Sequence, residues 1–245
     1  MQQWTALFIK DFKLTRSLFF IGIVMNVLIA ILALYMERET DDPLLMFVPL
    51  AIAVAIHVIY VPLIVFVGLK SEGNLHLWLN NPQPASKLLL SKIINGLMMI
   101  LISLAMLYVL SRLLIIPKFS LIEPYWTDTW KLGWFILPHV IGISIELSVW
   151  VMVLWALYQY LKLKIGRWSW AAVAGAAILS AWLNALIKSS TLYRYVMDWG
   201  GITYKFPTIL SDPIQTYSGG YVYDLMIIVG LFILTAWLVD NKVEG

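Results

Sequence analysis

The chain has 245 residues, of which 61% are hydrophobic and 13% are charged. Soluble domains contain about 45–50% apolar and about 25% charged residues, so this composition excludes a soluble enzyme, a nucleic-acid-binding protein and a disordered tail. The net charge is only +3, and the absence of cysteine excludes disulfides and cysteine-ligated metals. The composition therefore predicts an integral membrane protein.

Six apolar runs follow one another along the chain, and each is long enough to cross about 30 Å of hydrocarbon as a helix. The runs are continuous rather than alternating, which argues against a membrane β-barrel. The predicted fold class is an all-α integral membrane protein, a single transmembrane domain over residues 1–245 with six transmembrane helices. The predicted spans cover residues 17–36, 44–69, 93–116, 132–157, 168–187 and 222–239. Pro62 and Pro138 are the predicted kink points of the second and fourth spans.

Lysine and arginine are unevenly distributed among the segments outside these spans. Ten basic residues lie before the first span, in the second and fourth connections and after the last span, whereas six basic residues lie in the other connections. Basic residues are enriched on the cytoplasmic side of membrane proteins. The sequence therefore predicts a multi-pass protein of the cell membrane with both termini in the cytoplasm.

Residues 4–16 have an amphipathic pattern at helical spacing. The apolar side holds Trp4, Leu7, Phe8, Phe12 and Leu14, and the basic side holds Lys10, Lys13 and Arg16. Ile9 and Asp11 break the pattern. We expect an interfacial helix whose basic side meets anionic lipid headgroups; a plain basic flank of the first span is the alternative.

The predicted cytoplasmic segment 70–92 is too charged and too rich in proline to cross a membrane. It nevertheless contains a cluster of large apolar residues, namely Leu75, Leu77, Trp78 and Leu79. Exposed clusters of this kind mark docking surfaces, and Pro82 and Pro84 would end a short helix here. The segment is therefore the predicted contact site for a soluble partner, and anchoring of Trp78 at the lipid headgroups is the alternative.

The order of residues in this segment resembles the coupling helix of ABC type-2 transporter permeases. Glu72 and Gly73 come first, Leu77 to Leu79 and Pro82 follow, and Leu88 to Leu90 and Lys92 complete the pattern. The chain departs from many members in having no arginine after the proline. The layout is also similar to that family, which has an N-terminal interfacial helix, six spans and a long external segment that re-enters the membrane before the last span. Residues 188–221 would be that segment here.

The resemblance implies a permease subunit of an ATP-driven exporter, similar to small bacterial peptide and antibiotic exporters. It would contact a cytoplasmic ABC ATPase and pair with a second permease, either identical or a sister chain. The implied ATPase contacts are Glu72, Gly73, Leu75, Leu77, Trp78, Leu79, Pro82 and Pro84. The sequence has no Gly-x-x-x-x-Gly-Lys-Ser/Thr phosphate loop. We therefore expect no cofactor on this chain, with ATP and Mg²⁺ bound by the partner ATPase.

Four polar residues within the predicted spans are candidates for the translocation pathway: Asn26, Arg112, His139 and Glu146. Glu146 lies near the middle of its span, where a carboxylate is costly and usually functional. It either lines a cavity or proton path, or joins two helices in its protonated form. For His57 in the second span we expect a packing role. Since the spans carry few charges, the expected cargo is amphipathic or hydrophobic: a peptide toxin, an antibiotic or a lipid-like molecule.

The sequence contains no recognised catalytic motif. There is no His-Glu-x-x-His sequence, and the three histidines lie in three separate segments. We therefore expect that the chain is not an enzyme. An integral membrane transferase or protease that uses His139 and Glu146 is one alternative, and a non-transporting immunity or sensor protein is another.

Overall fold

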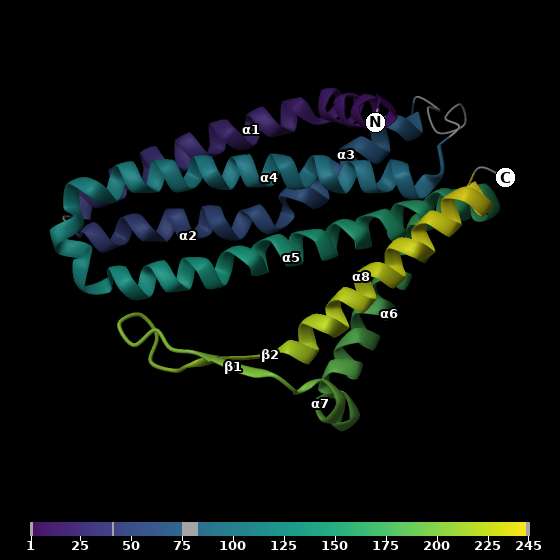
Figure 1. The fold of residues 1–245 in the computed structure, drawn as a ribbon. Helices are drawn as coiled ribbons and strands as arrows, with labels where there is room; N and C mark the ends of the chain where they lie inside the picture. The colour runs from purple at the N-terminus through teal and green to yellow at the C-terminus, as the bar shows by residue number, and fades with distance from the viewer. Residues whose placement is uncertain (1, 41, 75–82, 244–245) are drawn as a thin grey trace. The chain divides into compact units, whose positions relative to one another are not determined.

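The computed structural model describes residues 2–40, 42–74 and 83–243, and these residues are almost entirely helical (Figure 1). The first helix, α1, spans Gln2–Thr40 without a break. The sequence predicted an interfacial helix over residues 4–16, and its location at the membrane surface stays a prediction. No glycine or proline interrupts the helix between Trp4 and Gly22, so the helix continues past Arg16. Residues 4–16 are the first part of the same helix that contains the first predicted span.

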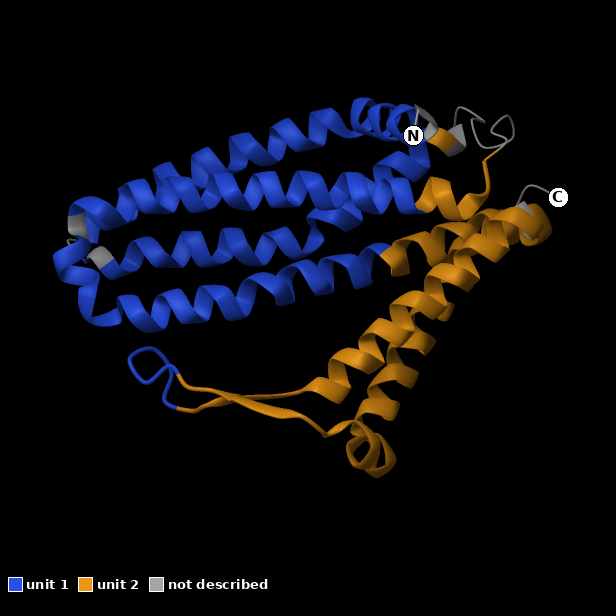
Figure 2. Cartoon of the chain, in the orientation of Figure 1, with its two compact units in different colours: residues 1–71, 90–148, 206–211 blue, residues 72–89, 149–205, 212–245 orange. Residues whose placement is uncertain are grey.

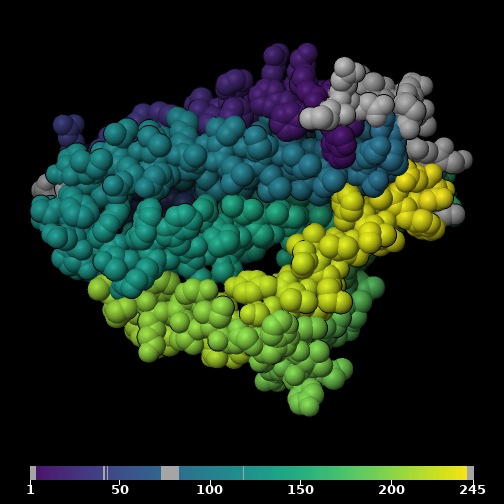
Figure 3. Space-filling model, in the orientation of Figure 1, coloured from purple at the N-terminus to yellow at the C-terminus, as the bar shows by residue number. Residues whose placement is uncertain are grey.

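Helix α1 buries its polar and small residues and exposes its large apolar residues. Asp11, Thr15, Asn26, Ala30 and Ala33 are all less than 9% exposed and recur at helical spacing. The opposite surface carries exposed apolar side chains, and the space-filling view shows part of α1, in purple, at the surface (Figure 3). These side chains include Phe20, Ile21, Val24, Leu28 and Ile31. A helix in water shows the reverse pattern, so this arrangement indicates that the outer face of α1 meets lipid.

The second predicted span folds as two helices, α2 (Phe47–Ile56) and α3 (Tyr60–Asn74). A short 3₁₀ helix at Pro43–Met46 precedes α2, and a 3₁₀ turn at His57–Ile59 joins α2 to α3. Pro62 accounts for the irregular turn, because proline has no N–H to donate to the carbonyl group four residues earlier. The sequence placed a kink at Pro62, and the observed change of helix lies one turn before it.

The next two helices are long. Helix α4 spans Ala85–Ile115, and after a 3₁₀ turn at Ile116–Lys118 helix α5 spans Phe119–Ile165. Helix α5 continues through Pro124 and the predicted kink point Pro138. Its 47 residues correspond to about 70 Å at about 1.5 Å per residue. Because the hydrocarbon layer is about 30 Å thick, α5 extends well beyond it.

The remaining elements follow α5 after a turn that requires glycine. Gly166 has φ +57, a backbone conformation that glycine adopts without a steric penalty, and it opens the 3₁₀ turn Gly166–Trp168. Helices α6 (Ser169–Ser189) and α7 (Thr191–Met197) come next, followed by strands β1 (Gly201–Tyr204) and β2 (Ile214–Tyr217). The strands form an antiparallel hairpin in which Gly201 pairs with Tyr217 and Tyr204 with Ile214. Residues 188–221, predicted to be a re-entrant-type external segment, thus form the end of α6, α7, this hairpin and the start of α8 (Ser218–Leu238), which a π-helical turn at Val239–Val243 follows.

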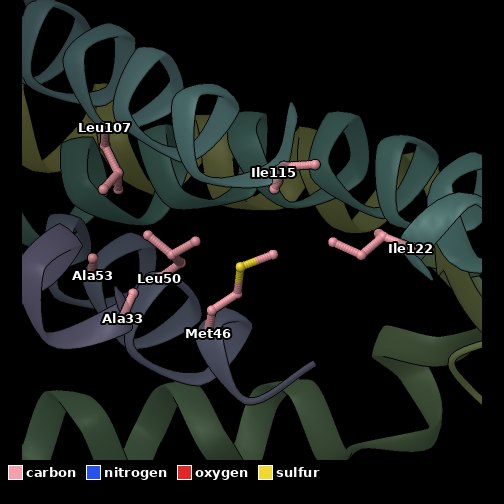
Figure 4. Close-up of a cluster of buried hydrophobic side chains, with 7 residues drawn as sticks. All are labelled: Ala33, Met46, Leu50, Ala53, Leu107, Ile115 and Ile122. Carbon is pink, nitrogen blue, oxygen red and sulfur yellow. The ribbon is translucent and has the colours of Figure 1, made fainter. Parts of the chain in front are cut away.

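The chain divides into two compact units (Figure 2). Unit 1 comprises residues 1–71, 90–148 and 206–211, and unit 2 comprises residues 72–89, 149–205 and 212–245. Unit 1 has an apolar core cluster in which side chains from α1, α2, α4, α5 and the turn before α2 meet (Figure 4). The cluster consists of Ala33, Met46, Leu50, Ala53, Leu107, Ile115 and Ile122. It lies beside the connections that the sequence predicts to be external.

Five helical stretches within the described part of the chain are long and apolar enough to cross a membrane. They are Trp4–Thr40, Leu44–Glu72, Ala85–Ile115, Phe119–Ser189 and Ser218–Asn241. Together with the lipid-facing surface of α1, these stretches confirm the predicted class at this level. The chain has the architecture of an all-α, multi-pass membrane protein.

The contact between α3 and α4 in unit 1 depends on a glycine. A Cβ added at Gly96 of α4 would lie 2.6 Å from Cγ1 of Val61 in α3, and a β-branched side chain has few other rotamers. We expect Gly96→Ala to lower the free energy of unfolding by about 1–3 kcal/mol, as overpacking typically does. Thermal unfolding of the purified variants in a single detergent measures the effect.

Gly142→Ala in α5 is the matched control, since no described atom lies within 4 Å of a Cβ added there. Replacing a helical glycine by alanine without a clash stabilises a helix by up to about 1 kcal/mol. Equal stability of the Gly96→Ala and Gly142→Ala variants would contradict the close packing of α3 on α4.

Candidate functional site

A buried ion pair joins α1 to the beginning of α4 in unit 1. Nζ of Lys92 lies 3.0 Å from Oδ1 of Asp11, and the Ser91 hydroxyl donates a hydrogen bond of 2.6 Å to Oδ2 of Asp11. The Asp11 and Lys92 side chains are only 3% and 2% exposed. Each charge therefore has its counter-ion inside the protein, as burial of charged groups requires.

Two more buried side chains extend this contact. The Asn95 amide donates to Oγ1 of Thr15 at 3.0 Å, and the Thr15 hydroxyl donates to the Asp11 carbonyl oxygen at 2.9 Å. Helix α3 packs against the same group of side chains at Gly68. A Cβ added at Gly68 would lie 3.7 Å from Cδ of Lys92 and 3.9 Å from Cγ2 of Thr15, so the backbone of α3 passes close to both. We call this group the polar anchor; it consists of Asp11, Thr15, Ser91, Lys92 and Asn95.

The polar anchor explains two features of the sequence that looked unrelated. Asp11 breaks the amphipathic pattern of residues 4–16 because it faces α4 and not water. Lys92, the last residue of the pattern that resembles a coupling segment, faces α1. Each of the two residues is a charge that interrupts an apolar pattern, and this signal marks both as candidates for a buried pair. Because 80 residues separate Asp11 from Lys92, the sequence alone does not show that these two charges meet.

The predicted ATPase contacts fall partly outside the described residues. Leu75, Leu77, Trp78, Leu79 and Pro82 are not among them, so a coupling helix here stays a prediction. Of the others, Glu72 lies near the end of α3 and is 1% exposed, Gly73 is in the last turn of α3, and Pro84 is exposed directly before α4.

In unit 2, the C-terminal turn contacts the start of α4. The backbone N–H of Ala85, the first residue of α4, donates a hydrogen bond of 2.9 Å to Oδ1 of Asp240. A carboxylate at the N-terminus of a helix is favourable, because the N–H groups there have no partner within the helix and carry a partial positive charge. The start of α4, which follows the predicted docking cluster, is thus held by the C-terminal turn.

A second polar cluster lies in the middle of unit 1. The Asn26 amide of α1 donates to the carbonyl oxygen and to Oγ of Ser103 in α4, both at 3.0 Å. His57, in the turn between α2 and α3, has Nε2 2.9 Å from Oγ of Ser103 and Nδ1 2.7 Å from the Ala53 carbonyl oxygen. Ser144 of α5 adds a long hydrogen bond of 3.5 Å to the His57 carbonyl oxygen. Asn26, His57 and Ser103 therefore connect α1, α4 and the turn between α2 and α3 at the level of the predicted membrane centre.

A serine hydroxyl beside an imidazole nitrogen is also the geometry of a nucleophile and its base. Here the Ser103 side chain is 0% exposed and His57 is 4% exposed. The Ser103 oxygen already accepts a hydrogen bond from Asn26, and its backbone lies within α4. A substrate carbonyl has no approach to this oxygen in the described structure, so we interpret the cluster as helix packing, the role expected for His57.

The four candidates for the translocation pathway have different surroundings. Asn26 belongs to the cluster with Ser103. Arg112 lies over the Trp126 ring, with its guanidinium carbon 4.9 Å from the ring centroid. His139 bonds through Nδ1 to the Phe135 carbonyl oxygen at 2.6 Å, within its own helix. Glu146 is half-buried on α5. Asn26 and Arg112 thus lie in separate contacts, and the role of the four residues in transport stays a prediction.

The tip of the β-hairpin, residues 206–211, contacts α5 within unit 1. The N–H and the hydroxyl of Thr208 donate to Oδ2 of Asp128 at 3.0 and 2.8 Å. Phe206 is 2% exposed, and its ring centroid lies 6.2 Å from that of Phe135. These contacts could not be predicted from the sequence, because Asp128 and Thr208 lie 80 residues apart.

Comparison with known proteins adds one relative. The chain is 26% identical, over 259 aligned positions that cover all of both chains, to a protein of Bacillus subtilis (strain 168) described as uncharacterized protein YhcE. No protein-family model matches the chain. No solved structure matches it either.

The polar anchor predicts strong coupling between its two charges. Lys92→Gln would leave the Asp11 carboxylate buried without a counter-ion, which typically costs about 3–5 kcal/mol of unfolding free energy. The double variant Asp11→Asn/Lys92→Gln carries neither charge, and we expect it to be more stable than Lys92→Gln alone. A double-mutant cycle based on unfolding in one detergent measures the coupling.

Lys188→Gln is the control, because Lys188 and Asp224 also form an ion pair, with Nζ and Oδ1 2.8 Å apart, but are 40% and 36% exposed. Loss of an exposed pair should cost no more than about 1 kcal/mol. Additive effects of the Asp11 and Lys92 substitutions would show that the buried pair does not act as a unit.

Proposed function

We propose that the chain is the permease subunit of an ATP-driven exporter and that ATP is hydrolysed by a separate cytoplasmic subunit. The observation that carries this proposal is the buried pair between Asp11 and Lys92. It fixes the exit of the segment that resembles a coupling helix directly to a membrane-spanning helix. A segment that receives force from a soluble motor needs such a rigid attachment, because a flexible one would absorb the motion.

Contacts at the two chain ends support a cytoplasmic location for both termini. In unit 1 the pair of Asp11 and Lys92 holds the N-terminal part of α1 beside the start of α4. In unit 2 the hydrogen bond from Ala85 to Asp240 holds the C-terminal turn beside the same start of α4. In each unit, one end of the chain is therefore bonded to a residue at the beginning of α4, within segment 70–92. The excess of basic residues in these segments favours the cytoplasmic side.

Six membrane crossings fit this arrangement. The stretch Phe119–Ser189 contains α5 and α6, and its 71 residues would extend over about 105 Å as a single helix, far more than one crossing needs. The turn at Gly166 divides it into two. Two crossings here and one in each of the other four stretches give an even number, as required if both termini share a side.

In this proposal, binding of the ATPase at Leu75 to Leu79 displaces the start of α4, and the polar anchor makes α1 follow α4. The second permease, identical or a sister chain, would supply the other half of the pathway. The few charges in the spans favour an amphipathic or hydrophobic cargo, such as a peptide, an antibiotic or a lipid-like molecule. This part of the proposal rests on the sequence pattern and the resemblance.

Replacement of Trp78 tests the contact with the ATPase. We expect the wild-type chain, purified through an affinity tag from its native cells, to carry a soluble protein with a phosphate-loop sequence that mass spectrometry identifies. Trp78→Ala should weaken this association roughly thirtyfold, because loss of an aromatic anchor typically costs about 2 kcal/mol or more.

The matched control is Trp168→Ala, which removes an exposed tryptophan, 63% accessible, from the first position of the fifth predicted span, directly after the next predicted cytoplasmic connection. It should leave the association unchanged. Retention of the ATPase at full stoichiometry by Trp78→Ala, or equal losses in the two variants, would contradict the proposed docking site.

Glu146→Gln tests the translocation pathway. Glutamine keeps the shape and hydrogen-bonding groups of glutamate but cannot titrate. If Glu146 acts in transport, the variant complex should assemble normally, and ATP hydrolysis in liposomes should no longer respond to amphipathic peptides or should lose its dependence on pH between about 5 and 8. Glu123→Gln, which changes an exposed carboxylate of the same helix, is the control. Wild-type behaviour of Glu146→Gln would assign Glu146 to helix packing.

A further inference from the structure

A shallow groove of about 370 Å³ lies on the surface of α1 near its N-terminus. Five described residues line it, namely Phe8, Ile9, Phe12, Lys13 and Arg16. Three of them are apolar, with Phe8 and Phe12 half-buried and Ile9 exposed, and the two basic side chains are exposed. The groove therefore combines an apolar surface with two adjacent cations.

The two cations have no ion-pair partner among the residues that the structure describes. Asp11 is the only acidic residue before Glu37 in the sequence, and it lies on the buried side of α1, where it pairs with Lys92. The carboxylate nearest to Lys13 and Arg16 along α1 is thus already paired within the polar anchor. Their charge remains available to an external anion.

The position of the groove along α1 matches the depth of lipid headgroups. Arg16 directly precedes the uncharged run of residues 17–36. One and two turns further along the helix from Arg16 lie Phe20 and Val24, which are 59% and 56% exposed. An anion bound at Lys13 and Arg16 would therefore lie next to exposed apolar side chains of α1, Phe20 and Val24, that continue into the predicted hydrocarbon layer. A phospholipid has both parts, a phosphate and acyl chains.

We propose that Lys13 and Arg16 form a binding site for one anionic phospholipid. The two side chains bind its phosphate, the apolar side chains of Phe8, Ile9 and Phe12 beside them reduce the access of water once the lipid is bound, and an acyl chain follows Phe20 and Val24. Exclusion of water strengthens charge contacts, so the site would favour anionic lipids over zwitterionic ones. The site does not depend on an ATPase partner.

Native mass spectrometry of the purified chain, titrated with phosphatidylglycerol or phosphatidylcholine, tests the site. Each basic residue near a membrane surface contributes about a fivefold factor to binding of an anionic lipid. The double variant Lys13→Gln/Arg16→Gln should therefore bind phosphatidylglycerol about thirtyfold more weakly. Binding of phosphatidylcholine should stay the same. Unchanged thermal unfolding would show that the variant is folded, as expected for two exposed residues.

The matched control is Lys162→Gln/Arg167→Gln, which removes two exposed basic residues from another predicted cytoplasmic segment and changes the net charge equally. It should bind phosphatidylglycerol like the wild type. Equal weakening in both double variants would overturn the proposal, because it would show a general effect of charge. Wild-type affinity of Lys13→Gln/Arg16→Gln would also overturn it.

Two further measurements distinguish binding of a lipid from binding of a soluble anion or of a protein partner. Soluble glycerol phosphate should not displace the lipid at a similar concentration, and displacement would show that the exposed apolar side chains contribute nothing. Loss of a co-purified soluble protein by Lys13→Gln/Arg16→Gln, with lipid binding unchanged, would assign the groove to a protein partner and overturn the lipid site. The Trp78→Ala experiment is independent of both results.

Discussion

Polar side chains that are withdrawn from water, whether by lipid or by neighbouring helices, turn toward the inside of the protein and bond to one another. This constraint sets the rotation of α1 about its own axis. Asp11, Thr15 and Asn26 all face neighbouring helices, while large apolar side chains such as Phe20 and Leu28 are exposed. Once α1 has this rotation, its contacts to α3 and α4 follow, and so does the orientation of Lys13 and Arg16 away from the bundle.

The same constraint distributes charge along the bundle. The buried Asp11–Lys92 pair lies at the N-terminal end of α4, and Arg112 lies against an aromatic ring near the other end of that helix. Between them, Asn26, His57 and Ser103 bond without a carboxylate or an ammonium group. The cost of an ionised group rises toward the membrane centre, which makes Glu146 the residue of the central region that needs a functional explanation most.

The proposed exporter function depends on how firmly segment 70–92 is attached. At its exit, Lys92 is paired with Asp11 and the first N–H of α4 is bonded to Asp240. At its entry, Glu72 is buried near the end of α3. A soluble partner that acts on the apolar cluster between these points would act on fixed helix ends. The tip of the β-hairpin is also held by specific contacts: Thr208 bonds to Asp128 near the start of α5, and Phe206 is buried.

The sequence by itself determined the membrane class and the approximate position of the apolar helices, because hydropathy sums over about 20 neighbouring residues and needs no partner. It also marked Pro62 as a source of irregularity, although the change of helix falls at His57–Ile59. Only the tertiary structure decided that residues 4–16 continue into the first span, that Asp11 meets Lys92, and that the loop containing Thr208 folds onto Asp128. Each of the two pairings joins residues about 80 positions apart. Which residues pair is therefore decided by how the helices and the loop pack against one another, and not by the local sequence.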